Sequence, residues 1–160
     1  MTGAAQTAGA SVVGQLSDIA PWEAELILSM RLWMEGPEGQ AEVWNGFARC
    51  FGAIEGRAEM RTFESLLTSL CTFARRPLVR HGLACRCIGS DEAILKTLVR
   101  EATCRDLAEA AMIACLLVPA RHAEPLAQMA AQVGRAMQRM ATRVPTGPRP
   151  QGARPDRTLH

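Results

Sequence analysis

The segment PWEAELILSMRLWM, residues 21–34, indicates the fold class of this chain. Pro21 suits the first turn of a helix, and Gly36-Pro37 ends a helix soon afterwards. The apolar residues of the segment cover most of the circumference of a helix instead of a single stripe. We therefore expect a helix from Pro21 to about Glu35 that is buried on most sides.

The same 3.6-residue periodicity continues outward along the chain. It predicts further helices over about 38–51 and 56–75, after Ser90 as the N-cap, and over about 105–118 and 123–141. The helix over about 105–118 is apolar on most sides and should also be central. The last helix carries a narrow stripe at coiled-coil spacing, made of Leu126, Ala130, Val133, Met137 and Met140. The fold class predicted is all-α, a single compact bundle of about six antiparallel helices with flexible N- and C-terminal tails.

The two ends of the chain differ from this helical pattern. Residues 1–16 are small and polar and read as a flexible N-terminal arm, whereas residues 142–160 are rich in Pro, Gly and Arg and read as a flexible tail. Residues 17–141 remain as one helical domain. A domain of this length can bury a core without help from disulfides.

Targeting signals are not evident in the sequence. The first fifteen residues lack the charged and apolar regions of a signal peptide, and the longest apolar run, residues 110–120, is shorter than the roughly 20 residues that span a bilayer. We expect a cytoplasmic protein with no membrane partner. In that compartment six cysteines favour free thiols or metal ligands over disulfides.

The segment between the third and fourth expected helices, residues 77–90, is here called the Cys/His loop. It holds His81, Cys85 and Cys87 within seven residues, and imidazole and thiolate are ligands that zinc prefers. A structural zinc site usually takes four ligands. Antiparallel helices with short connections would bring Cys71 or His122 to the same end of the bundle, so either is a candidate for the fourth position. The sequence thus predicts a zinc-type site.

Other interpretations of the Cys/His loop remain open. The C-x-C spacing is less specific than C-x2-C, and no second pair completes a known zinc-finger pattern. His81 could simply cap the preceding helix, with Cys85 and Cys87 as ordinary loop thiols. The loop could also form a redox pair or hold an iron–sulfur cluster, since Arg80, Arg86 and the start of the next helix would favour a thiolate.

These features favour a regulatory or adaptor protein whose metal-bound loop meets a protein partner. One alternative is a metal-free interaction module or homodimer that pairs through the stripe on the last helix. Another is weak nucleic-acid binding through an Arg-rich loop and tail, although the formal net charge is only +2. The sequence shows no P-loop, dinucleotide fingerprint, serine-hydrolase elbow or H-E-x-x-H pattern, so it does not indicate an enzyme.

Overall fold

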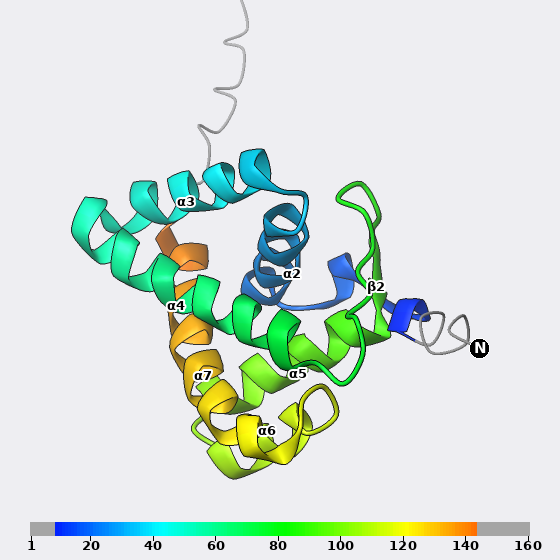
Figure 1. The fold of residues 1–160 in the computed structure, drawn as a ribbon. Coiled ribbons are helices and arrows are strands. Elements are labelled where there is room, and N and C mark those ends of the chain that lie inside the picture. The colour runs from blue at the N-terminus through cyan, green and yellow to red at the C-terminus, as the bar shows by residue number, and fades with distance from the viewer. Residues whose placement is uncertain (1–8, 144–160) are drawn as a thin grey trace, which may run out of the picture.

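Six helices pack together in the computed structural model, which describes residues 9–143 of the 160-residue chain. This arrangement confirms the predicted all-α bundle (Figure 1). The helices are α2 (Pro21–Trp33), α3 (Pro37–Phe51), α4 (Ala53–Phe73), α5 (Ser90–Thr103), α6 (Leu107–Ala114) and α7 (Ala120–Arg143). Their starts and ends differ from the expected ones by a few residues, as helix boundaries commonly do.

The last helix, α7, lies at the centre of the bundle and packs against α2, α4, α5 and α6. All five residues of its apolar stripe are at most 7% exposed. Gly134 lets α5 come close, because a Cβ atom at this position would lie 1.8 Å from Oγ1 of Thr103. The stripe is therefore part of the protein's own core, and a homodimer would need another surface.

The helix expected over about 105–118 is shorter and more peripheral than predicted. Helix α6 buries only Ala110 and Ala114, while Met112 is 69% exposed and Leu116, just after the helix, is 65% exposed. Its small residues pack against α5 and α7, so the large apolar side chains are left outside. The expectation of a central helix was wrong because apolar residues around a helix do not all have to be buried.

A two-stranded ribbon joins the N-terminal segment to the Cys/His loop. Strand β1 (Val12–Gln15) pairs antiparallel with β2 (Cys87–Gly89), and Figure 1 shows β2 beside the start of α5. Residues 12–15 of the predicted flexible arm are therefore a strand. Helix α7 also extends to Arg143, two residues into the predicted tail. The other parts of the predicted arm and tail that fall in residues 1–8 and 144–160 lie outside the described residues.

Two contacts link three of the connections between helices. The guanidinium of Arg80 in the Cys/His loop lies 2.9 Å from Oε1 of Glu35, which follows α2. The N–H of Arg75, which follows α4, donates to the carbonyl of Leu117 before α7 at 2.9 Å. Among residues 9–143, no helix combines the length and apolar character needed to cross a membrane.

Candidate thiol–imidazole site

The Cys/His loop is wrapped around a buried arginine from α2. Arg31 is 0% exposed, and its Nε and Nη2 donate to the two carboxylate oxygens of Glu92 at 2.7 and 2.8 Å. Its Nη1 donates to the carbonyls of Gly82 at 3.1 Å and Cys85 at 2.7 Å, and its Nη2 also donates to that of Cys87 at 2.6 Å. A guanidinium has five N–H donors, and all five are used here. We call this set of bonds the arginine clamp.

Both members of the clamp's ion pair remain charged. The hydrogen bond to Glu92 raises the pKa of Arg31 above its ordinary value, against the effect of burial. Burial raises the pKa of Glu92. Hydrogen bonds from Arg31 and from the N–H groups of Gly89 and His81 lower this pKa, and together they outweigh the effect of burial. The net pKa of Glu92 lies below its ordinary value. A buried ion pair is tolerable only when such bonds satisfy it, so the loop backbone is part of what keeps the charges stable.

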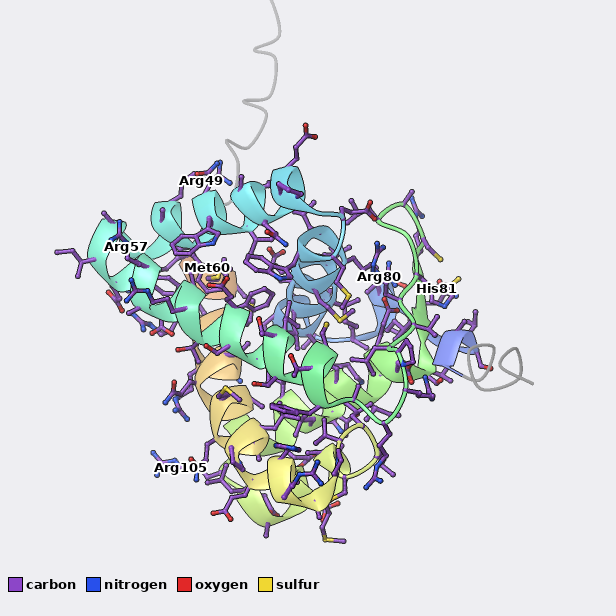
Figure 2. All side chains as sticks on the ribbon, in the orientation of Figure 1. Arg49, Arg57, Met60, Arg80, His81 and Arg105 are labelled. Atoms are coloured by element: carbon purple, nitrogen blue, oxygen red, sulfur yellow. The ribbon has the colours of Figure 1, made fainter. Side chains whose placement is uncertain are left out.

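His81 is oriented by the N-terminal segment. Its Nε2 lies 2.9 Å from the carbonyl oxygen of Ala10, and Figure 2 shows His81 on the side of the molecule where that segment lies. A carbonyl can only accept, so Nε2 must carry a hydrogen. In the neutral ring this leaves Nδ1 as the acceptor. That atom lies 3.4 Å from Sγ of Cys85.

The sulfur of Cys85 therefore has a base beside it and a second hydrogen-bond donor. The backbone N–H of Cys87 donates to Sγ of Cys85 at 3.4 Å. This bond and the contact with His81 both lower the pKa of the Cys85 thiol. Transfer of the thiol proton to Nδ1 would give a thiolate that accepts from an imidazolium and an amide. The arrangement can thus generate a nucleophilic sulfur.

A glycine makes room for the imidazole. A Cβ atom on Gly89 would lie 2.8 Å from Cδ2 of His81 and 3.1 Å from the carbonyl oxygen of Gly9.

On the other side of the loop, Asp91 accepts two hydrogen bonds from Arg76, at 2.8 and 2.7 Å, and one from the N–H of Val79 at 2.8 Å. The Cys/His loop is consequently anchored at both of its ends.

The five predicted zinc ligands do not all come together. His81 and Cys85 are in contact, and the Sγ of Cys87 lies 3.8 Å from Nε2 of Gln15. Cys71 is exposed near the end of α4, and the ring of His122 stacks on Phe73 with centroids 3.8 Å apart. Within residues 9–143 no three His, Cys, Asp or Glu side chains are placed to hold a metal ion. Zinc and an iron–sulfur cluster therefore stay predictions, whereas all six cysteines are free thiols in the structure.

Sequence reasoning missed the residue that organises the loop. Arg31 is the single charged residue among the apolar side chains of the segment 26–34, and a charge in such a helix requires a buried partner. That signal was present, but it does not say which carboxylate pairs with it. An acidic residue in the first turn of a helix, such as Glu92, also suits the positive end of the helix dipole, so its position does not mark it as the partner of Arg31.

Comparison with known proteins adds no assignment. No family model matches the chain, and neither curated proteins nor solved structures gave a match.

Proposed function

We propose that this chain is a regulatory or adaptor protein that binds a protein partner through the exposed rim of the Cys/His loop. The observation that supports this most directly is the arginine clamp, which holds the backbone of a surface loop in one conformation. The rim consists of Gly82, Leu83, Ala84 and Arg86, which are all exposed. The rim thus presents an apolar side chain, Leu83, and a cationic side chain, Arg86, three positions apart on a fixed backbone.

A fixed loop favours binding for an entropic reason. Ordering a flexible segment at the moment of association costs free energy, and a loop that is already ordered avoids most of that cost. In the clamp, the arginine of a buried ion pair holds three carbonyl groups of one loop. The helices need no such contacts to hold their own backbone. Recognition residues are commonly found on loops that a rigid scaffold positions.

A protein partner fits the charges better than a nucleic acid does. Of the arginines near the loop, Arg76 is paired with Asp91 and Arg80 with Glu35, while Nε of Arg75 donates to the carbonyl of Cys115. These guanidinium groups are less available for phosphate contacts, which dominate affinity for nucleic acids. Nucleic-acid binding stays a weaker alternative, and it predicts retention on DNA or RNA that falls steeply with salt.

Site-specific photo-crosslinking in cells tests this proposal. A photo-reactive amino acid is placed at Leu83 in the full chain, and a matched control carries it at the still more exposed Met112 on α6. We expect a discrete crosslinked protein from position 83 that position 112 does not give. Arg86→Glu should weaken that crosslink. The proposal fails if position 83 gives no crosslink, or only the products that position 112 gives.

A further inference from the structure

A cleft lies where the end of α2 approaches the end of α4 and the segment that follows α4. Its volume is about 420 Å³, which is within the range of pockets that hold small molecules. Apart from two arginines, the side chains that line it are apolar or a thiol, namely Met34, Cys71, Ala74, Pro77 and Leu78. Met34 and Leu78 also pack against the hydrophobic core. The cleft therefore suits the apolar part of a ligand.

The two arginines of the cleft, Arg75 and Arg76, differ in their partners. Both terminal nitrogens of Arg76 donate to the carboxylate of Asp91, at 2.8 and 2.7 Å, so the charge of Arg76 is balanced. Arg75 is exposed, and within residues 9–143 it forms no ion pair. One positive charge at the cleft thus has no carboxylate partner.

Arg75 is nevertheless held in place by the connection between α6 and α7. Its backbone N–H donates to the carbonyl of Leu117 at 2.9 Å, and its Nε donates to the carbonyl of Cys115 at 3.1 Å. The bond from Nε leaves the N–H groups of Nη1 and Nη2, which can donate in parallel to the two oxygens of one carboxylate. A side chain that is already positioned loses less entropy when a ligand binds.

We propose that this cleft binds an aliphatic monocarboxylate, with its carboxylate on Arg75 and its hydrocarbon chain against Met34, Ala74 and Leu78. A single unpaired cation suits a single negative charge, because a second charge on the ligand would have no cationic partner in the cleft. Among the described residues that line the cleft, none is a Ser, Thr, Asn, Gln, Asp or Glu that could pair with the polar groups of a sugar or a peptide. The inference goes beyond the proposed function and requires no protein partner.

Cys71 provides a reporter for this site, because it is exposed and lines the cleft. The full chain is labelled with a maleimide in the presence of a metal chelator, and peptide mass spectrometry gives the rate at each cysteine. With octanoate at about 3 mM and a dissociation constant of about 1 mM, we expect labelling of Cys71 to slow about fourfold. Labelling of Cys104, which is also exposed, should stay unchanged. Acetate and 1-octanol at the same concentration carry only the head or only the chain, and each should slow Cys71 by less than about twofold.

The role of the charge is tested by replacing Arg75. Arg75→Gln should reduce the protection of Cys71 by octanoate to less than about twofold, and Arg75→Lys should retain part of it. Arg49→Gln is the matched control, because Arg49 is an exposed arginine on α3 that does not line the cleft, and protection should be unchanged (Figure 2).

The comparison of octanoate with 1-octanol on the wild type decides the inference even if Arg75→Gln fails to fold. Equal protection by the two compounds, no protection by octanoate, or equal slowing at Cys104 would overturn it. Full protection in a folded Arg75→Gln variant would do the same. The two proposals fail separately, because a crosslink at Leu83 without protection of Cys71 removes only the carboxylate site, and the reverse result removes only the protein partner.

Discussion

Arg31 and Glu92 stand 61 positions apart in the sequence and form a two-bond ion pair in which both side chains are 0% exposed. The pair connects α2 to the first turn of α5, and the remaining donors of Arg31 hold the Cys/His loop. The fixed shape of the loop is thus a property of the core. A substitution of Arg31 or Glu92 in the core should therefore alter the conformation of the Cys/His loop at the surface.

Replacing Arg31 tests how much the clamp stabilises the fold. Arg31→Met leaves Glu92 buried without its partner, and we expect a loss of about 3–5 kcal/mol in the free energy of unfolding. Arg100→Met is the control, because Arg100 forms its ion pairs with 43% of its side chain exposed and should cost less than about 1 kcal/mol. Urea unfolding measures both. Equal costs for the two variants would show that the clamp does not stabilise the protein.

The clamp should also make the free energy of unfolding depend on pH. The pKa of Glu92 is lowered in the folded protein from an ordinary value of 4.5, so the unfolded chain binds more protons between the two values. The stabilisation from this carboxylate is complete above about pH 4.5 and is lost as the pH falls through the folded pKa. Glu92→Gln should be less stable than wild type at pH 7, and the difference should shrink toward pH 3. A difference independent of pH would contradict the charged pair.

Two helical glycines should respond in opposite ways to the same substitution. Gly134→Ala forces a Cβ against Thr103 and should destabilise the protein by about 1–3 kcal/mol. Gly46 in α3 has no atom within 4 Å of the position of a Cβ, and Gly46→Ala should stabilise by about 0.5–1 kcal/mol. Thermal unfolding of both variants checks the close approach of α5 and α7. A neutral Gly134→Ala would refute that packing.

Zinc binding by the Cys/His loop is a further prediction, and it can be tested by melting temperatures and metal analysis. The separation of 3.4 Å between Nδ1 of His81 and Sγ of Cys85 is close to the roughly 3.5 Å expected for two ligands of one tetrahedral zinc ion. A zinc site predicts that chelator lowers the melting temperature of the wild type but not of Cys85→Ser. Less than about 0.2 zinc or iron per chain, in protein purified without chelator, would exclude it.

The helices could be predicted from sequence because their signals are local. Apolar spacing, Pro21 at a helix start and Ser90 ahead of an acidic turn all act within a few residues. The site could not be assembled in this way. The pairing of Arg31 with Glu92, and of His81 with the carbonyl of Ala10, depends on tertiary packing between segments far apart in the chain.

The two strands could not be predicted from local sequence either. Strands β1 and β2 are too short to give an alternating pattern, and Val12 and Val13 are both 57% exposed, so no buried face marks them. The two adjacent β-branched residues were the available hint. What stabilises the ribbon is its partner strand 72 residues away, which local sequence does not reveal.

The Arg31–Glu92 pair should also affect the order in which the helices pack during synthesis on the ribosome. Helix α2 is synthesised early, but its arginine has no buried counter-charge until Glu92 has left the exit tunnel. At about 5–20 residues per second, those 61 residues take roughly 3–12 s to make. During that interval, packing α2 into an apolar core would bury an unpaired charge. We therefore expect α2 to dock only after the nascent chain has reached α5.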